Sequence, residues 1–277
     1  MERLRILVAG CGYVGSALAA RLADDGHAVW GLARRPRDLP AGVRPLAADL
    51  GDPAALADLP PGLDAVFYTA AAEEGGEDAY RTAYVLGLGH LLDALERDGS
   101  PRRVFFTSST AVYGQSDGSW VDETSPAEPP GHRGRILLEA EARLGASPIA
   151  GCAVRLGGIY GPGRTRLLER VRAGTATLPR GPEYTNRIHR DDCAGALRHL
   201  LGLERPEPLY LGVDDDPADR RVVLRWLAER LGVPPPREAP EGAAPAAGKR
   251  CRNARLRASG YRFRYPTFRE GYAPLLR

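Results

Sequence analysis

Short apolar runs alternate with amphipathic stretches along most of the chain. Residues 4–9 (LRILVA) form a short apolar run, as expected of a strand that is buried on both faces of a parallel sheet. Similar runs recur at residues 27–33, 44–48, 64–69, 103–108, 149–155 and 208–213. Apolar residues return at helical spacing over residues 16–25, 53–59, 79–97, 134–144, 188–202 and 218–231. Strands that alternate with helices predict an α/β fold, a Rossmann-type doubly wound parallel sheet.

A glycine-rich turn, GCGYVG, joins the first predicted strand to the first predicted helix. Gly10, Gly12 and Gly15 have the spacing G-x-G-x-x-G. These glycines allow a tight turn, close approach of a pyrophosphate to the backbone, and close packing of helix on strand. Because the motif lies within the first βαβ unit, it predicts a dinucleotide site that includes Tyr13 and Val14.

The end of the second predicted strand indicates which dinucleotide is bound. An NAD site usually has an acidic residue there, which binds the 2′-hydroxyl of the ribose. In this chain the strand ends in Ala33, Arg34 and Arg35, with no acid before Asp38. Two guanidinium groups fit a 2′-phosphate, so NADP is the predicted cofactor and NAD the less favoured one. The alternative is that both arginines only point into solvent.

Further cofactor contacts are expected after the third and fourth strands. Asp49 and Leu50 lie where the edge of an adenine would be held, and Ala70 and Ala71 are small enough to let the cofactor pass.

The alternation of strands and helices weakens in the second half of the chain, where Gly, Pro and Arg become frequent. We expect residues 1–156 and 187–213 to form the dinucleotide-binding Rossmann domain. Residues 157–186 and 214–277 are expected to form a small substrate-binding cap over the C-terminal edge of the sheet. The Pro-, Ala- and Gly-rich tract at 232–250 predicts a linker or a surface excursion.

The composition limits the class of protein. Of the 277 residues, 43% are hydrophobic and 26% charged, which is ordinary for a globular protein. No apolar run approaches the roughly 20 residues that a membrane span needs. The net charge of +3 is too small to indicate a nucleic-acid partner. Cys11, Cys152, Cys193 and Cys251 lack metal-site or disulfide spacing, so we expect free thiols, no metal and a cytoplasmic location.

Two further motifs, FFTSSTAVYG (105–114) and RLGGIYGPGR (155–164), resemble those of a known family. With the glycine-rich turn, they are similar to the extended short-chain dehydrogenase/reductases, the NAD(P)-dependent sugar epimerase/dehydratase family. NRIHRDD (186–192), NARLRASGYRFRYP (253–266) and GRILLEAE (134–141) look like its atypical, YeeZ-like branch. The resemblance spans nearly the whole chain. It implies a Rossmann fold with a cap, an NAD(P) cofactor and oxidoreductase chemistry on a small molecule.

The resemblance fails at the family's usual catalytic set of Asn, Ser/Thr, Tyr and Lys. Ser109 matches the hydroxyl position, but Tyr84, Gly131 and Arg135 stand where Asn, Tyr and Lys would be. A tyrosine works as an acid or base near neutral pH only when a neighbouring cation stabilises its phenolate. Arg135 cannot release a proton, so we assign it to cofactor binding, anchored by Glu139 four residues on. The alternative is a solvated helix residue.

Several groups could replace the missing acid or base. His132 has a suitable ordinary pKa, and Tyr113 and Tyr160 follow strands and could present phenols to a substrate. Ser109 could bond a substrate oxygen directly, while its neighbour Ser108 is expected to contact the cofactor. The plainer alternatives are an exposed histidine, packed tyrosines and a turn serine.

Arginines are frequent in the predicted cap. They are Arg164, Arg166, Arg170, Arg172, Arg180 and Arg187. If several line a cleft, they would attract a phosphate or pyrophosphate, as in a nucleotide sugar. Tyr160, Arg164 and Arg187 are therefore predicted substrate contacts. The alternative is surface arginines set by an overall bias, because only Lys249 of the 38 basic residues is lysine.

A possible triad fragment lies nearby, where His189 precedes Asp191 and Asp192. Since this histidine opens a predicted helix, we interpret the two acids as helix capping.

Two functions remain open. The first is an NADP-dependent oxidoreductase, of epimerase/dehydratase or reductase type, acting on a small anionic substrate. Losing a general acid or base costs about 10²–10⁴-fold in rate and does not by itself abolish turnover. The alternative is a catalytically weak NADP(H)-binding sensor or regulatory protein. Residues 79–97 and 134–144 would be the usual pairing surface in this family and allow a homodimer.

Overall fold

The computed structural model folds into two compact units, each described here by itself. The structure describes residues 2–72, 76–97, 99, 101–241 and 248–276. Unit 1 comprises Met1–Tyr113, Ala127–Arg155 and Cys193–Tyr210. Unit 2 comprises Gly114–Pro126, Leu156–Asp192 and Leu211–Arg277. Residues 114–126 thus belong to unit 2, although the sequence places them in the Rossmann domain. The assignment of dinucleotide binding to one unit and substrate binding to the other stays a prediction.

A seven-stranded sheet carries the fold in the described part of the chain, with the strand order β11-β7-β5-β4-β1-β2-β3. The strands are β1 (Arg5–Ala9), β2 (Ala28–Ala33), β3 (Val43–Ala47), β4 (Ala65–Tyr68), β5 (Arg103–Ser109), β7 (Gly151–Leu156) and β11 (Leu209–Gly212). The pairs from β3 through β2, β1 and β4 to β5 are all parallel. Because the order runs outward from β1 in both directions, the predicted Rossmann-type doubly wound fold is confirmed.

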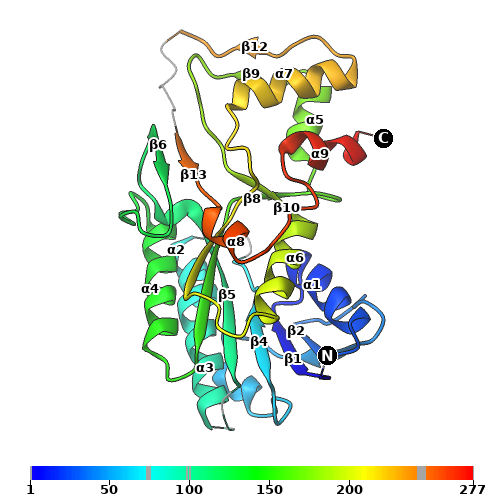
Figure 1. The fold of residues 1–277 in the computed structure, drawn as a ribbon, viewed down its shortest axis with the longest axis vertical. Coiled ribbons are helices and arrows are strands. Elements are labelled where there is room, and N and C mark those ends of the chain that lie inside the picture. Colours follow the sequence, from blue (N-terminus) through cyan, green and yellow to red (C-terminus); the bar gives the residue numbers. More distant parts are fainter. Residues whose placement is uncertain (1, 73–75, 98, 100, 242–247, 277) are drawn as a thin grey trace. The chain divides into compact units, whose positions relative to one another are not determined.

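Helices lie on both faces of this sheet (Figure 1), with α3 and α4 on one side and α1 and α6 on the other. The helices are α1 (Tyr13–Asp24), α2 (Glu77–Arg81), α3 (Gly87–Arg97), α4 (His132–Ala146) and α6 (Arg190–Leu201). Short 3-10 turns are η1 (Pro53–Leu56) and η3 (Thr110–Val112). Ile6, Leu7 and Val8 of β1 are completely buried, as the apolar run predicts.

The predicted helix at 79–97 is interrupted by a π-helical turn, η2 (Thr82–Leu86), between α2 and α3. The Tyr68 hydroxyl, at the end of β4, donates a hydrogen bond to the Ala83 carbonyl inside this turn. A side chain that bonds a helical carbonyl is a recognised cause of such distortion. A Cβ atom on Gly87 would lie 2.5 Å from the Tyr68 hydroxyl, so the glycine makes this approach possible.

Unit 2 contains three two-stranded sheets within the described residues. They pair β8 (Gly158–Tyr160) with β10 (Arg187–His189), β9 (Thr177–Leu178) with β12 (Arg237–Glu238), and β6 (Asp117–Val121) with β13 (Gly248–Cys251). Its helices are α5 (Arg166–Arg172), α7 (Arg220–Leu231), α8 (Ala254–Ala258), α9 (Phe268–Tyr272) and the 3-10 turn η4 (Ala273–Leu275). The core of the unit includes Leu168, Leu224 and Phe268.

One prediction for this region needs correction, and a second gains detail. The helix expected at 188–202 begins only at Arg190, because Ile188 pairs with Ile159 as part of strand β10. The tract at 232–250, expected to be a linker or a surface excursion, contains the exposed two-residue strand β12 and the start of β13. Residues 242–247 of that tract lie outside the described residues.

Candidate functional site

The glycine-rich turn after β1 is held in one conformation. Gly10 has a φ of 90°, and a Cβ atom there would lie 2.2 Å from the backbone nitrogen of Ala70. A Cβ atom on Gly15 would lie 2.4 Å from the Gly10 carbonyl oxygen. That same oxygen accepts a hydrogen bond of 2.9 Å from the Thr69 hydroxyl. No larger residue fits at Gly10 or Gly15 without moving the backbone.

Gly12, between them, faces open space. It is exposed, and a Cβ atom there would meet only the Gly10 carbonyl oxygen, at 4.0 Å. Helix α1 begins at the next residue, Tyr13, and its first turn contains no acidic side chain. Helix N–H groups and the helix dipole favour an anion at such a terminus. The residues present therefore fit the pyrophosphate of a dinucleotide, while Val14 is buried beneath them.

Arg34 and Arg35 directly follow the last residue of β2, and both are exposed. The turn continues with a hydrogen bond of 2.8 Å from the Arg37 N–H to the Arg35 carbonyl. Asp38, the first acid after the strand, has a φ of 55°. The structure thus places two guanidinium groups beyond the end of β2, next to the strand that leads into the glycine-rich turn.

The other predicted cofactor residues lie on the turns after β3 and β4. Asp49 is exposed and accepts a 2.8 Å hydrogen bond from the Gly51 N–H. Leu50 is half-buried, and Ala70 packs against Gly10 while Ala71 is exposed. The turns after β1, β2, β3 and β4 meet at the carboxyl edge of a parallel sheet, where ligands of such folds bind. Contact between these residues and a cofactor stays a prediction.

Ser108 and Tyr113 belong to a buried network that sequence reasoning missed. The Ser108 hydroxyl donates to Glu141 Oε1 at 2.6 Å. Arg155 donates to both carboxylate oxygens of Glu141, at 3.0 and 2.7 Å, and to the Tyr113 hydroxyl at 2.8 Å. Tyr113 is only 2% exposed, with the Arg155 guanidinium 4.9 Å from its ring centroid. These contacts favour a structural role for Tyr113, which the sequence presents as a catalytic candidate.

Ser109 ends β5 and is only partly buried. Its Oγ accepts a 3.2 Å hydrogen bond from the Ala111 N–H, which caps the turn η3. This is the turn serine of the plainer interpretation, yet the hydroxyl hydrogen can still donate to a substrate oxygen.

The position of the missing tyrosine is open. Gly131 is the N-cap residue of α4, and a Cβ atom there would meet no atom within 4 Å. His132, the first residue of the helix, is half-buried, and Arg135 is exposed. Glu139 does not anchor Arg135 as expected, because it accepts two hydrogen bonds from Arg81 of α2, at 2.6 and 2.8 Å.

A cavity of about 670 Å³ lies within unit 2. Four arginines and two glutamates line it, Arg164, Arg166, Arg187, Arg220, Glu169 and Glu183. Arg220 is paired with Glu183 at 3.0 Å. Arg187 is buried and donates to the Thr185 carbonyl at 3.1 Å, whereas Arg164 is exposed. The excess of positive charge suits an anionic ligand.

Tyr160 also lines this cavity, and its hydroxyl has no hydrogen-bond partner among the described residues. The ring is 5% exposed and stacks on Tyr272, with centroids 4.5 Å apart. A Cβ atom on Gly271 would lie 1.7 Å from the Tyr160 hydroxyl, so this packing needs the glycine. Burial, together with the nearby Asp214 carboxylate, raises the pKa of Tyr160. Asp214 Oδ2 is likewise buried without a partner in the described chain.

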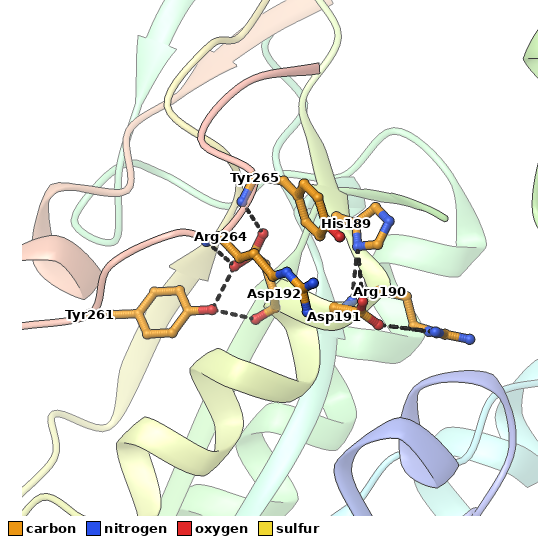
Figure 2. Close-up of polar contacts among 7 residues, drawn as sticks. All are labelled: His189, Arg190, Asp191, Asp192, Tyr261, Arg264 and Tyr265. Atoms are coloured by element: carbon orange, nitrogen blue, oxygen red, sulfur yellow. Dashed lines mark hydrogen bonds and ion pairs between the residues drawn. The ribbon is translucent and has the colours of Figure 1, made fainter. Parts of the chain in front are cut away.

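The histidine and acids at the start of α6 do not form a triad (Figure 2). The Asp191 N–H donates to His189 Nδ1 at 3.2 Å, and the Asp191 carboxylate pairs with Arg190 at 3.0 Å. His189 is buried, which lowers its pKa against the opposing effect of Asp191. The lowered pKa favours the neutral ring, whose Nδ1 accepts the hydrogen bond from the Asp191 N–H.

Asp192 is completely buried and does not cap the helix as expected. Its carboxylate accepts hydrogen bonds from the Tyr261 hydroxyl at 2.7 Å, the Arg264 N–H at 2.8 Å and the Tyr265 N–H at 2.9 Å (Figure 2). Asp192 thus holds the segment 261–265 against the start of α6. The ring centroids of Tyr265 and His189 lie 4.0 Å apart.

No group of three or more potential metal ligands comes together among the described residues. None of their helices has the length and apolar character that a bilayer span requires.

The chain is similar to several known proteins. The 3-diazoavenalumate denitrifying reductase of a Streptomyces species is 30% identical, over 97% of this chain and 99% of that protein. Protein YeeZ of Escherichia coli K12 is 32% identical over 84% of this chain and 85% of YeeZ. The dTDP-6-deoxy-L-talose 4-dehydrogenase (NAD(P)(+)) of Kitasatospora kifunensis is 32% identical over 82% of this chain and 79% of its own.

A solved structure and a family profile agree with these relatives. The structure, described as an NAD-dependent epimerase/dehydratase from Methylobacillus flagellatus, has a TM-score of 0.83 and 38% identity. The alignment covers 99% of this chain and 98% of that one. The NAD dependent epimerase/dehydratase family matches residues 6–201. The chain therefore belongs to this family of NAD(P)-binding, Rossmann-type oxidoreductases and resembles its YeeZ-like members, which confirms the resemblance drawn from its motifs.

Proposed function

We propose that the protein is an NADP(H)-dependent oxidoreductase that interconverts a carbonyl and a hydroxyl group on a small anionic substrate. The observation that carries this proposal is the pair of exposed guanidinium groups, Arg34 and Arg35, which follow β2. They stand where an NAD site has a carboxylate. Strand β1 pairs with β2, and the turn after β1 contains Gly12, whose backbone has open space around it. A phosphate on the 2′-oxygen of the ribose would be held by such groups and repelled by a carboxylate.

The chain's own residues would divide the work. The N–H groups at the start of α1 bind the pyrophosphate, and Arg34 and Arg35 bind the 2′-phosphate. Ser109 donates its hydroxyl hydrogen to the substrate oxygen, and His132 is the titratable group next to the open position of Gly131. When bound, the nicotinamide supplies or accepts a hydride.

The cavity of unit 2 supports an anionic substrate. Arg187 and Arg164 line it, and the buried hydroxyl of Tyr160 lacks a protein partner among the described residues. Two of the relatives are named a reductase and a sugar-nucleotide dehydrogenase, which supports turnover over a purely sensing role. We therefore propose a phosphate or carboxylate group as the part of the substrate that this cavity binds.

The cofactor assignment is tested by fluorescence titration of the protein with NADPH and NADH. The wild type should bind NADPH more tightly. Arg34→Ala and Arg35→Ala should each weaken NADPH binding about 10-fold or more, the value of one charge-assisted hydrogen bond, and leave NADH binding unchanged. Arg37→Ala, an exposed arginine of the same turn, is the matched control. Equal affinity for the two dinucleotides would overturn the assignment to NADP.

The substrate assignment is tested with a panel of sugar nucleotides and oxo acids, each paired with a neutral analogue that lacks the anionic group. Arg164→Ala should raise KM for the anionic compounds with little change in kcat. Arg172→Ala, an exposed arginine that does not line the cavity, is the control. Faster turnover of the neutral analogues would contradict an anionic substrate.

A further inference from the structure

Two tyrosines form a phenol pair in unit 1, close to the position where the family's usual Asn is missing. Tyr80 lies in α2 and Tyr84 in the π-helical turn η2, and both are half-buried. Their ring centroids are 4.5 Å apart with an interplanar angle of 43°. The side chain of Tyr84 hydrogen-bonds the Tyr80 phenol. The four-residue spacing, one helical turn, is the only sequence signal for this pair.

The first turn of α4 faces the same phenol. The Arg133 guanidinium carbon lies 5.9 Å from the Tyr80 ring centroid, and the His132 ring meets that ring edge-on at 6.4 Å. Burial raises the pKa of Tyr80, while the hydrogen bond of Tyr84 and the charge of Arg133 act to lower it. Burial is the largest of these effects, so the pKa of Tyr80 lies above its ordinary value, and Tyr84 and Arg133 offset part of that rise.

Other charged side chains of α2 pair with groups other than Tyr80. Arg81 is paired with Glu139 of α4, and it also interacts with Glu77 and Asp78 at the start of α2. Among the described residues, α4 therefore presents the charged Arg133 and the titratable His132 to the Tyr80 ring.

The phenol pair packs beside β5, and the Tyr68 hydroxyl at the end of β4 bonds the turn η2 that carries Tyr84. The Tyr84 ring meets the ring of Phe106, on β5, at 6.3 Å. A Cβ atom on Gly134 of α4 would lie 2.6 Å from the Ala111 carbonyl oxygen, in the turn that Ser109 caps. The start of α4, which carries Arg133, thus packs against the Ser109 turn, at the edge of the sheet where ligands bind.

We propose that Tyr80 is the proton-transfer group of this enzyme, with Tyr84 and Arg133 stabilising its phenolate. This inference rests on the proposed oxidoreductase function. In this arrangement Tyr80 of α2 provides the phenol that Gly131 lacks. Arg133 provides the cation that the family usually has at position 135. The open space at Gly131 leaves room for this exchange.

The step balances for a carbonyl reduction with NADPH as the reductant. The O–H bond of Tyr80 breaks and its proton passes to the substrate oxygen, while the carbonyl carbon receives a hydride from the nicotinamide. The products are an alcohol and NADP⁺. The remaining phenolate, held by the Tyr84 hydrogen bond and by Arg133, regains a proton from solvent or from His132.

The first test needs no cofactor. Ultraviolet difference absorbance follows phenolate formation with pH, and subtracting the Tyr80→Phe curve from the wild-type curve isolates Tyr80. Arg133→Gln and Tyr84→Phe should each move this titration to higher pH, because each removes a group that favours the phenolate. Arg230→Gln removes a guanidinium that lies 5.5 Å from Trp226 in unit 2, and it should leave the Tyr80 titration in place. An unchanged titration in Arg133→Gln and in Tyr84→Phe would overturn the proposal.

The second test measures turnover and cofactor binding in the same variants. Tyr80→Phe keeps the ring, so it should lower kcat by about 10²–10⁴-fold with an unchanged Kd for NADPH. The control is Tyr184→Phe, a half-buried tyrosine whose ring would keep its contact with Arg250 at 4.6 Å. Wild-type kcat in Tyr80→Phe would refute the role of Tyr80 and leave the proposed function standing. Failure of the wild type to bind NADPH would instead refute the proposed function, and the titration would still judge the phenol pair.

Discussion

Each unit of the molecule buries an arginine together with a tyrosine, but the two clusters differ in how completely their polar atoms are bonded. In unit 1, Arg155 is 6% exposed and donates to both Glu141 and Tyr113. In unit 2, Arg187 is 7% exposed, yet the Tyr160 hydroxyl and one Asp214 oxygen lie buried without a partner among the described residues.

This difference in hydrogen bonding indicates a structural role for the first cluster and a ligand-binding role for the second. A buried polar group without a hydrogen bond costs about 1–3 kcal/mol, so folded proteins keep few of them. Such groups are expected where a ligand or water completes the bonding. The Arg155 cluster leaves no buried side-chain polar atom without a partner among the described residues, whereas Tyr160 and Arg187 line the cavity of unit 2. We infer that the first cluster stabilises its unit and that the second is arranged for a ligand.

The largest expected effect comes from breaking the bonded cluster. Arg155→Met should lower the free energy of unfolding by about 3–5 kcal/mol, because it leaves the Glu141 carboxylate buried without its partner. Urea denaturation measures this change. Arg102→Met is the control, since its side chain is 72% exposed and 3.9 Å from Asp64, and such surface pairs contribute about 0–1 kcal/mol. A loss in Arg155→Met no larger than that of the control would remove the distinction between the clusters.

A smaller effect should distinguish the two tyrosines. Tyr113→Phe removes an acceptor of Arg155 and should cost about 1 kcal/mol or more of unfolding free energy. Tyr160→Phe removes a hydroxyl that no described residue hydrogen-bonds, so the stability should stay the same or rise slightly. The urea midpoint of each variant is measured and compared with that of the wild type. Equal losses would show that the Tyr160 hydroxyl is bonded in the folded protein.

The smallest change is expected at Asp214, and it depends on pH. Burial raises the pKa of Asp214 well above its ordinary value, with Arg187 opposing the shift. The folded state therefore binds this proton more strongly than the unfolded chain does. The stability that it contributes is fully present below the ordinary Asp pKa of about 4, and it is lost as the pH rises towards the folded pKa.

Asp214→Asn cannot titrate, so its stability relative to the wild type should increase as the pH rises from about 4 to neutrality. Urea midpoints measured across this range give the difference directly. Asp58→Asn, at an exposed position, controls for the loss of one negative charge. A difference between Asp214→Asn and wild type that stays constant with pH would contradict a raised pKa at Asp214.

Much of unit 1 could be predicted from the sequence because its signals are local. Short apolar runs mark most strands of the sheet. The glycine-rich turn directly follows β1, and its Gly10 and Gly15 leave no space for a larger residue. The fold class, the family and the place of the glycine-rich turn all follow from such short patterns. The predicted pairing of Arg135 with Glu139 was wrong because a local spacing does not show competitors from elsewhere in the chain. Glu139 pairs instead with Arg81, which lies on another helix.

The parts that could not be predicted depend on contacts between distant residues. Strand β6 pairs with β13, more than a hundred residues later, and neither has an apolar pattern. The bonds from Arg155 to Glu141 and Tyr113 join a strand, a helix and a turn that no local periodicity connects. The phenol pair of Tyr80 and Tyr84 becomes visible only when α4 brings Arg133 over it.

The carboxylate of Asp192 has a consequence for synthesis on the ribosome. Its donors, Tyr261, Arg264 and Tyr265, follow it by 69 to 73 residues. Until they have left the exit tunnel, this acid has no bonds that would compensate its removal from water. We therefore expect unit 2 to remain incompletely folded while the nascent polypeptide grows, and to complete its folding only after residue 265 has left the ribosome.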